Sequence, residues 1–497
     1  MKDTTLFRAV QEKTRVFIVS DISNEPDDAE SLVRYLLYSN EFDTRGLVAC
    51  TSNWMKRVVH PEDMLKIIEA YGKVVDNLNK NVHPDNQYSP AEYFASIVKT
   101  GPALYGKEAL QPGVPMSDGA KLLIDRLDES DKPLWILCWG GTNVLAQALQ
   151  HVRQTRSEDE SHLLRSKMRV YAISDQDDTG AWIRREFPDI FYIASVHGWN
   201  QYGLAAWTGI SGDKFYGFDK GGPNFEKISK EWIAENIQIG PLGKAYPEYF
   251  FIPEGDTPTF LYLIQNGLGS PEHPDWGSWG GRYLRSDAGP DGGRHYSDAV
   301  DHVVGQEGQT HVSNQATIWR WRDKFQDSFA ARMQWTLSDD NSKTNHAPVV
   351  VVNGDSSIGA LWIEAEAGTG IELDATGTYD PDGDQLTYRW FQYKDVTATQ
   401  WWVDAEVQDV VFKDQNAEKP GLRVKVQLPP PEKCAVDILT GVAQEKGQAL
   451  HLILEVTDNG RPPLTTYKRV IVQVTNKDLR GGRQTAAESV MEAHGAL

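Results

Sequence analysis

Residues 15–28 read Arg15-Val16-Phe17-Ile18-Val19-Ser20-Asp21-Ile22-Ser23-Asn24-Glu25-Pro26-Asp27-Asp28. The first half is a short apolar run that ends in a carboxylate. After the acidic loop, apolar residues recur at helical spacing over residues 29–38. The stretch therefore predicts a buried strand that carries acidic side chains at its carboxyl end and leads into a helix.

Runs of the same kind recur further along the chain. Apolar stretches that predict strands lie at residues 46–51, 133–139, 168–174 and 190–195, and helical periodicity recurs at 62–75 and 142–152. Nearly continuous apolar strands are typical of parallel sheets that are buried on both faces. We therefore predict an α/β domain with an open, mostly parallel sheet and helices on both faces.

Polar side chains follow several of these predicted strands. They lie at residues 21–28, 51–54, 140–143 and 175–178. In open α/β sheets, ligands bind at the carboxyl ends of the strands. Because the four clusters converge on one edge of the predicted sheet, that edge is the predicted site.

The character of the sequence changes after residue 338. A polar linker at 339–346 is followed by short apolar runs separated by turns, which predict an all-β sandwich of immunoglobulin type. The predicted strands of this sandwich are residues 347–352, 371–374, 386–391, 449–456 and 469–474. The predicted order is an N-terminal arm (1–14), the α/β domain (15–338, with a helical segment at 316–337), the linker (339–346), the sandwich (347–476) and a flexible tail (477–497).

Composition narrows the class of partner. The 497 residues include 50 Lys and Arg against 70 Asp and Glu, a net charge of −20. This balance argues against nucleic acid or an anionic membrane as a partner and suits neutral sugars or cations. No apolar run approaches the roughly 20 residues of a membrane helix. The three cysteines, Cys50, Cys138 and Cys434, are expected to be small buried hydrophobic residues.

The N-terminus has no apolar core of signal-peptide length. We therefore expect either a cytoplasmic protein or a secreted one whose signal peptide is absent from this sequence. A homo-oligomer is left open as a further possibility.

The acidic loop holds four carboxylates within the eight residues 21–28. Such groups repel one another unless a cation, hydrogen-bond donors or raised pKa values compensate. Clustered oxygen ligands of this kind suit calcium. A simpler interpretation is that Asp27 and Asp28 cap the following helix and complement its dipole. That interpretation accounts less well for Asp21 and Glu25.

The loop resembles that of the nucleoside hydrolases, whose first strand is followed by an aspartate-rich motif. Asp21 matches the first aspartate of that motif, and Asp27-Asp28-Ala29 matches its end. Later stretches that look like the family are Thr51-Ser52-Asn53, Gly141-Thr142-Asn143 and Gly255-Asp256-Thr257-Pro258. The resemblance implies a calcium site formed by Asp21, Asp28, Thr142 through its carbonyl, and Asp256, with Asn53 at the sugar. No organic cofactor is expected.

The likeness is closer to a nucleoside hydrolase-like family described as cellulose-binding proteins, in which this domain is joined to a C-terminal sandwich. It spans residues 15–476 and is carried by residues 21–28, 31–35, 139–143, 174–178, 254–258 and 279–283. It implies the fold described above and a carbohydrate as the partner.

The motif departs from the true nucleoside hydrolases at Ser23. In those enzymes an aspartate at this place binds calcium and helps to activate the attacking water. A serine hydroxyl is a poor base and removes one charge from a metal site. Glu25 is an additional carboxylate in the same loop and could replace the missing acid or base. The predicted catalytic residues are therefore Glu25, Asp28 and Asp21.

Other side chains are candidates for contact with a sugar. Residues 174–178 fit either a solvated, helix-capping turn or hydrogen bonding to sugar hydroxyls. Most of the 16 Trp residues are expected in the core, but Trp54 and the Gly-flanked loop 275–282 are candidates for stacking on sugar rings. The predicted substrate-binding residues are Asn24, Asn53, Trp54, Asn143, Asp175, Asp177, Asp178, Glu254, Trp279 and Arg282.

The predicted sandwich contains one further acidic motif, Asp380-Pro381-Asp382-Gly383-Asp384. It fits a tight turn, with a structural calcium site as the alternative.

Three functions remain open from the sequence. The first is hydrolysis of a glycosidic bond in a plant or microbial glycan, with two carboxylates as acid and base or nucleophile. The second is carbohydrate or cellulose binding without catalysis. The third, N-ribohydrolase activity on nucleosides, is disfavoured by Ser23.

Overall fold

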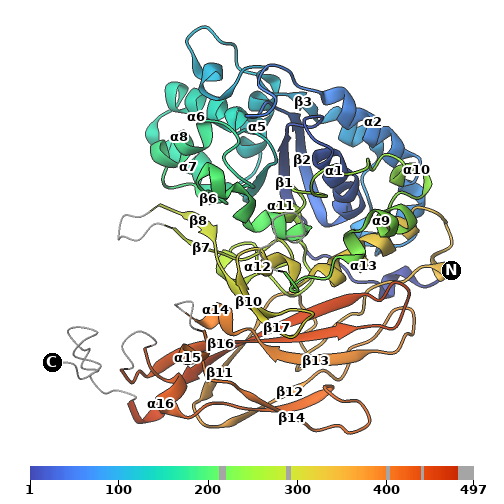
Figure 1. Cartoon of the computed structure of the whole chain (residues 1–497), viewed down its shortest axis with the longest axis vertical. Helices are drawn as coiled ribbons and strands as arrows, with labels where there is room; N and C mark the ends of the chain where they lie inside the picture. Colours follow the sequence, from blue (N-terminus) through green and yellow to red (C-terminus); the bar gives the residue numbers. More distant parts are fainter. Residues whose placement is uncertain (212–219, 287–292, 399–402, 438–441, 480–497) are drawn as a thin grey trace.

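The computed structural model describes residues 1–211, 220–286, 293–398, 403–437 and 442–479. Within these ranges an α/β domain and a β-sandwich lie end to end (Figure 1). None of the helices in the described part of the chain has the length and apolar character needed to cross a bilayer.

The centre of the α/β domain is an eight-stranded sheet with the order β3-β2-β1-β4-β5-β6-β8-β7. All neighbouring strands are parallel except β7 and β8. The strands are β1 (Thr14–Ser20), β2 (Phe42–Ala49), β3 (Val98–Thr100), β4 (Leu134–Cys138), β5 (Met168–Ala172), β6 (Phe191–Ala194), β7 (Tyr283–Arg285) and β8 (His295–Asp298). A separate hairpin is formed by β9 (Asp301–Val304) and β10 (Thr310–Ser313).

Helices cover both faces of this sheet. Alternate residues of β1 face different cores, with Val16 and Ile18 in one and Phe17 and Val19 in the other. The first core packs against α1 (Asp27–Tyr38), α2 (Pro61–Gly72), α3 (Val75–Leu78), α4 (Ala91–Ser96), α9 (Lys230–Asn236), α10 (Gly240–Gly243), α11 (Pro258–Leu261), α12 (Ala316–Trp319) and α13 (Arg322–Trp335). The second packs against α5 (Asp118–Asp128), α6 (Asn143–Thr155), α7 (Glu158–Ser166) and α8 (Thr179–Glu186). The predicted α/β fold is confirmed.

The C-terminal domain is a sandwich of two sheets, with the orders β11-β17-β16-β13 and β12-β15-β14. Pairing is antiparallel except between β11 and β17. The strands are β11 (Leu361–Glu366), β12 (Gly370–Asp374), β13 (Thr387–Gln392), β14 (Val411–Asp414), β15 (Arg423–Gln427), β16 (Lys446–Thr457) and β17 (Thr465–Thr475). Short helices accompany them at α14 (Lys394–Thr397), α15 (Val403–Glu406) and α16 (Pro431–Cys434). The predicted β-domain is therefore present.

Two predicted elements differ in detail. Residues 347–352 form no strand, only single bridges, because Pro348 has no N–H to donate and Asn353, at φ +50°, turns the chain back. The helical segment predicted at 316–337 is divided at Arg320 and Trp321 into α12 and α13. The three cysteines are buried and free, as expected.

The two domains meet across a buried interface. Arg469 of β17 donates from Nε to the carbonyl of Leu268 at 2.7 Å and from Nη2 to that of Trp276 at 2.9 Å. The backbone N–H of Tyr467 bonds the carbonyl of Asn266 at 2.9 Å. A Cβ at Gly267 would lie 2.0 Å from the Tyr467 carbonyl oxygen, so only glycine permits this approach.

The segment predicted as an N-terminal arm packs between the domains (Figure 1). The ring of Phe7 stacks on His346 with centroids 3.9 Å apart, and Arg8 forms an ion pair with Glu41 at 2.8 Å. Most of the predicted tail, residues 480–497, lies outside the described residues.

Candidate functional site

Aspartates from two distant parts of the chain meet at the carboxyl end of β1. Asp21 follows this strand directly and is 1% exposed. Asp27, Asp28 and Asp256 each contribute a carboxylate oxygen to a group whose atoms lie within 4.8 Å of one another. Asp27 and Asp28 begin α1, but neither caps it, because Pro26 occupies the cap and no side chain bonds the first turn there. We call Asp21, Asp27, Asp28 and Asp256 the acid cluster.

A buried ion pair brings Asp256 to this position. Arg34 of α1 donates from Nη1 to Oε2 of Glu254 at 2.8 Å, and both side chains are almost wholly buried. The backbone N–H of Glu254 donates to Oε2 of Glu30 at 2.9 Å. Glu254 has φ +56°, the left-handed region that a non-glycine residue adopts only when held there. The loop before α11 is thus tied to α1, the helix that carries Asp27 and Asp28.

The carboxylates of the acid cluster are short of donors. Burial raises the pKa of Asp21 to about 6. Burial, with repulsion from Glu25 and Asp21, raises the pKa of Asp27 to about 7. The same causes raise the pKa of Asp28 and of Asp256 well above the usual range. Both carboxylate oxygens of Asp256 and Oδ2 of Asp21 have no hydrogen-bond partner among the described residues.

The carboxylate oxygens of the acid cluster fit a hard cation such as calcium as its ligands. They carry negative charge, and several of them have no hydrogen-bond partner in the part of the chain described here. Thr142, the fourth ligand implied by the resemblance, bonds through its hydroxyl to Thr179 at 2.8 Å, while its carbonyl accepts the helical N–H of Ala146 at 3.0 Å. The end of β4 does approach the cluster, since a Cβ at Gly140 would lie 2.7 Å from Asp21 Oδ1.

Two adjoining cavities open beside the acid cluster. The inner one, of about 270 Å³, is lined by Asp21, Asn24, Glu25, Asp27, Asp28, Trp54, Trp139, Ile173, Gln176, Tyr202, Trp207, Phe251, Ile252 and Asp256. The outer one, of about 760 Å³, shares Asn24, Glu25, Trp54 and Phe251 with it. Three aromatic residues stand exposed there: Trp54 at 51%, Phe250 at 75% and Phe251 at 65%. We call the outer cavity the aromatic groove.

Glu25 and Ser23 occupy different sides of the loop after β1. Glu25 borders both cavities, and burial raises its pKa above the usual value. Ser23 has φ +78° and donates its hydroxyl to Oδ2 of Asp63 at 2.5 Å. Its side chain is therefore directed to α2 and lines only the groove, so it does not replace an acid-cluster carboxylate.

The second acidic strand end, after β5, is mostly structural. Asp177 accepts the backbone N–H of Thr179 at 2.8 Å and that of Asn143 at 3.1 Å, and it thereby caps α8 and α6. Asp175 pairs with Arg184 at 2.5 Å. Asp178 accepts the N–H of Lys107 at 2.8 Å at the surface. Of the predicted residues in this segment, none borders the inner cavity, whereas Gln176 does.

Several predicted contact residues lie away from both cavities. Asn143 is fully buried, and its Nδ2 donates to Thr51 Oγ1 at 2.9 Å. The backbone of Asn53 donates to Gln176 at 2.6 Å. Trp279 packs at the domain interface, 3.4 Å from the hydroxyl of Tyr467. Arg282 pairs with the buried Asp301 at 2.7 Å. Asn24 and Trp54 do line the site, and Glu254 supports it from beneath.

Both domains of the chain match models of one protein family. Residues 15–283 match the family described as cellulose-binding Sde182, nucleoside hydrolase-like domain, and residues 370–474 match the C-terminal domain of the same cellulose-binding protein. The chain belongs to the Sde182 family.

One solved structure agrees with that assignment. A nucleoside hydrolase-related hypothetical protein from Saccharophagus degradans, described as associated with carbohydrate metabolism, is 30% identical to this Sde182-family chain with a TM-score of 0.73. The match covers 93% of this chain and 100% of that one. An inosine-uridine preferring nucleoside hydrolase from Bacillus anthracis is 16% identical with a TM-score of 0.31, over 66% of this chain and 100% of that one. No curated protein sequence matches significantly.

Sequence reasoning missed much of the lining of this Sde182-family site. Asp27 stands in the quoted motif but is not among the predicted catalytic or metal-binding residues, because capping of the following helix also accounts for it. Gln176 adjoins predicted aspartates and donates its side-chain amide to the Trp139 carbonyl. Tyr202, Trp207 and Phe251 come from the Trp- and Gly-rich segment after β6, which carries no periodic signal that could have placed them.

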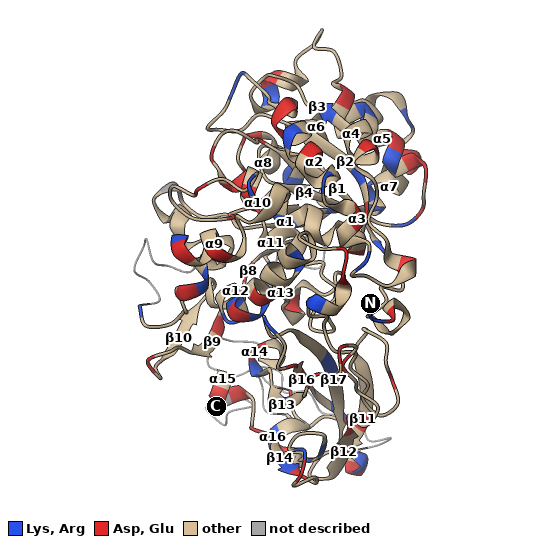
Figure 2. Ribbon diagram, turned by 90° about the vertical axis from the view of Figure 1, so that its right-hand side faces the viewer, with Lys and Arg blue, Asp and Glu red and all other residues tan. Residues whose placement is uncertain are grey.

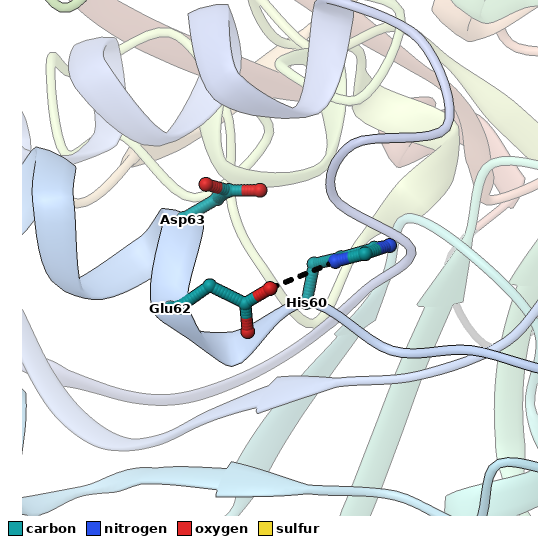
Figure 3. A group of neighbouring side chains, drawn as sticks. All are labelled: His60, Glu62 and Asp63. Carbon is teal, nitrogen blue, oxygen red and sulfur yellow. Dashed lines mark hydrogen bonds and ion pairs between the residues drawn. The ribbon is translucent and has the colours of Figure 1, made fainter.

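Another group of possible metal ligands stands at the rim of the groove. Figure 3 shows His60, Glu62 and Asp63 at the start of α2, with His60 Nδ1 2.9 Å from Glu62 Oε1. Asp63 is already paired with Lys66 at 2.6 Å. Because these side chains are at least partly exposed and already have partners, we assign no metal to them. Elsewhere Lys and Arg are interspersed with Asp and Glu over both domains (Figure 2).

The raised pKa values predict how stability depends on pH without metal. An unfolded aspartate titrates near 3.8, whereas Asp21 and Asp27 titrate near 6 and 7 in the folded chain. The folded state therefore binds more protons, and in excess chelator the free energy of unfolding is expected to fall as the pH rises from about 4 to about 7. Urea denaturation at a series of pH values measures this decline.

Asp27→Asn removes one titrating carboxyl and is expected to reduce the decline. Asp85→Asn, at an aspartate whose side chain is 83% exposed, serves as the control and should leave the profile as it is. An Asp27→Asn profile that coincides with the wild-type profile would contradict the prediction.

Proposed function

We propose that this chain binds a carbohydrate in the aromatic groove, with one part of the glycan inserted into the inner cavity beside the acid cluster. The observation that carries the proposal is the exposure of Trp54, Phe250 and Phe251 around a cavity that continues into the acidic one. Large exposed aromatic side chains at a cavity are uncommon unless a ligand covers them. The family description supports a cellulose-like, β-linked glucan as the glycan.

The chemistry of the groove suits a sugar chain. Aromatic rings offer flat apolar faces that pack against the C–H faces of pyranose rings. Asn24 and Glu25, which border both cavities, offer hydrogen-bonding groups for hydroxyls. The groove, at about 760 Å³, lies within the roughly 300–1,000 Å³ typical of small-molecule sites. It remains open to solvent, which suits a chain that extends beyond the site.

We further propose calcium as the cation of the acid cluster, held by Asp27, Asp28 and Asp256 with Asp21 beside them. Bound calcium would compensate the buried negative charge and could orient sugar hydroxyls. The support is the set of partnerless oxygens on Asp21 and Asp256 within the described chain. Asp27 completes the group of three carboxylates that can share one ion.

Hydrolysis of a glycosidic bond is the second candidate function. The observation that favours it is the position of Glu25, a carboxyl with a raised pKa that lines both the groove and the inner cavity beside the acid cluster. Such a group stays protonated to higher pH and can protonate a leaving oxygen. An acid-cluster carboxylate that is not occupied by a cation could serve as the second acid–base group. Nucleoside hydrolysis has less support, because Ser23 is bonded to Asp63 instead of the cluster.

The binding proposal is tested by removing the aromatic faces. Trp54→Ala and Phe251→Ala are each expected to weaken the binding of cellohexaose about tenfold, about 1.4 kcal/mol, because the sugar loses a stacking surface. Isothermal titration calorimetry measures this affinity, and sedimentation with insoluble cellulose tests the polymer.

Trp362→Ala is the matched control. Trp362 is 58% exposed, comparable to Trp54, but it belongs to the sandwich. It should bind as the wild type does. If Trp362→Ala loses binding while Trp54→Ala keeps it, the carbohydrate site lies in the sandwich and the proposal fails.

Catalysis is tested with Glu25→Gln, which keeps the shape of the side chain but cannot donate a proton. Aryl β-glucosides and cello-oligosaccharides are the substrates. If Glu25 is the general acid, the variant loses about 10²- to 10⁴-fold in kcat while its affinity for cellohexaose stays close to that of the wild type. The wild-type rate should also fall as the pH rises through the elevated pKa of Glu25.

Glu62→Gln, at an exposed carboxylate near the rim of the groove, is the control and should keep the wild-type rate. Absence of any turnover by the wild type would remove catalysis and leave binding as the function. Release of ribose from inosine or uridine in the same assay would favour the nucleosidase alternative.

A further inference from the structure

A second carboxylate cluster lies outside the proposed site, where the linker meets the sandwich. Asp380, Asp382 and Asp384 each present an oxygen within 4.8 Å of the others. Asp458 is a fourth carboxylate, in the neighbouring turn between β16 and β17. The two turns are joined by a hydrogen bond from the N–H of Gln385 to Asn459 Oδ1 at 2.9 Å.

Among the described residues, only one of these four carboxylates, that of Asp382, has a basic side chain as an ion-pair partner. Lys2 pairs with Asp382 at 2.7 Å, and His346 Nδ1 lies 3.0 Å from the same carboxylate. Over the described ranges no Lys, Arg or His forms an ion pair with Asp380, Asp384 or Asp458. Three of the four carboxylates are therefore left without an ion-pair partner in the described structure.

Independent observations point to a ligand at this cluster. Asn345 and Asp458 are 5% and 4% exposed, and Oδ1 of Asn345 and Oδ2 of Asp458 have no hydrogen-bond partner in the described structure. The same holds for Oδ2 of Asp380. Asn345 Nδ2 donates to Asp458 Oδ1 at 3.0 Å, so the partnerless oxygens belong to side chains in contact. All three atoms are acceptors, and buried acceptors without a donor are rare.

A water or a protonated carboxyl would satisfy this site less well. Asp458 Oδ1 already accepts from Gly460 N at 2.9 Å, Leu464 N at 3.0 Å and Asn345 Nδ2, so local donors are used on its other oxygen. One water has two hydrogens for three orphaned acceptors and adds no charge. Oxygen-only ligands with a surplus of negative charge suit calcium, which takes about 6–8 oxygen ligands in flexible geometry.

We propose that this is a calcium site, with Asn345, Asp380, Asp384 and Asp458 as its ligands. It joins three segments: the linker before the sandwich, the turn before β13 and the turn between β16 and β17. Its neighbour Asp382 holds Lys2 and His346 from the opposite side, and His346 stacks on Trp335 of the α/β domain with centroids 5.4 Å apart. Calcium here holds the linker to the sandwich and so stiffens the joint between the domains.

Counting bound calcium in the full chain tests the site. Metal is removed with chelator and calcium is returned at constant ionic strength, with the number bound measured by equilibrium dialysis. Asp458→Asn is expected to lose one calcium per chain. Asp256→Asn, which alters the acid cluster, should retain it, as should Asp404→Asn, at an exposed carboxylate of the sandwich. Equal calcium numbers and affinities in Asp458→Asn and wild type would overturn the proposal.

Folding of the variant does not obscure this test. Asparagine keeps the acceptor that Asp458 uses for Gly460 and Leu464, and its amide offers a donor to neighbouring orphaned oxygens. In chelator, Asp458→Asn should therefore melt no lower than the wild type, whereas added calcium should raise the Tm of the wild type more than that of the variant.

A second readout reports the joint itself. Lys343 lies in the linker with its side chain 70% exposed and is a trypsin site. Calcium should slow tryptic cleavage after Lys343 several-fold in the wild type and in Asp256→Asn, but not in Asp458→Asn. The same slowing in Asp458→Asn would show that calcium acts elsewhere and would overturn the proposal.

Discussion

The candidate site depends on the buried ion pair between Arg34 and Glu254. Arg34 is fully buried in α1, and its guanidinium also donates to Gln326 at 2.8 Å and to the Phe325 carbonyl at 2.7 Å. The pair therefore links α1, α13 and the loop before α11. Desolvating an ion pair is costly, and such a pair is weak evidence for net stability. What it supplies is position, since it sets Asp256, two residues beyond Glu254, against the aspartates that open α1.

Placing Asp256 beside these aspartates has an electrostatic cost, because the buried carboxylates repel one another. Parallel strands and the start of α1 bring Asp21, Asp27 and Asp28 to one edge of the sheet, and the tied loop adds Asp256. Buried like charges destabilise a folded chain unless protons or a cation compensate them. The junction cluster around Asp458 presents the same imbalance in a different domain. In both places the carboxylates are held by well-bonded backbone turns, so the surrounding structure keeps them close despite their repulsion.

Much of this arrangement was predictable from the order of strands and their polar ends. β1, β4 and β5 end where apolar runs give way to Asp21, Gly140 and Asp175, and the sheet order sets them side by side. The roles of individual side chains were less predictable. The left-handed backbone at Ser23 directs its hydroxyl to Asp63. The carboxylate of Asp177 accepts backbone N–H groups from the first residues of α8 and α6. Residue type and spacing do not encode such directions, because they follow from contacts between segments far apart in sequence.

The Trp- and Gly-rich loop 275–282 shows why composition alone misplaces a binding surface. Glycines and tryptophans there were expected to approach a sugar, but the same properties suit close packing of two domains. Gly277 allows Tyr393 to approach, since a Cβ at Gly277 would lie 2.6 Å from the Tyr393 hydroxyl, and Trp276 gives its carbonyl to Arg469 of the sandwich. The interface thus buries this aromatic loop, and Trp276 lies near Thr14 and Arg15 at the start of β1 instead of at its carboxyl end. The exposed rings of Trp54, Phe250 and Phe251 have no such covering domain, and they flank a cavity that ends in carboxylates. Exposure together with that continuity, and not aromatic content, is what distinguishes the proposed glycan-binding groove from the domain interface in this fold.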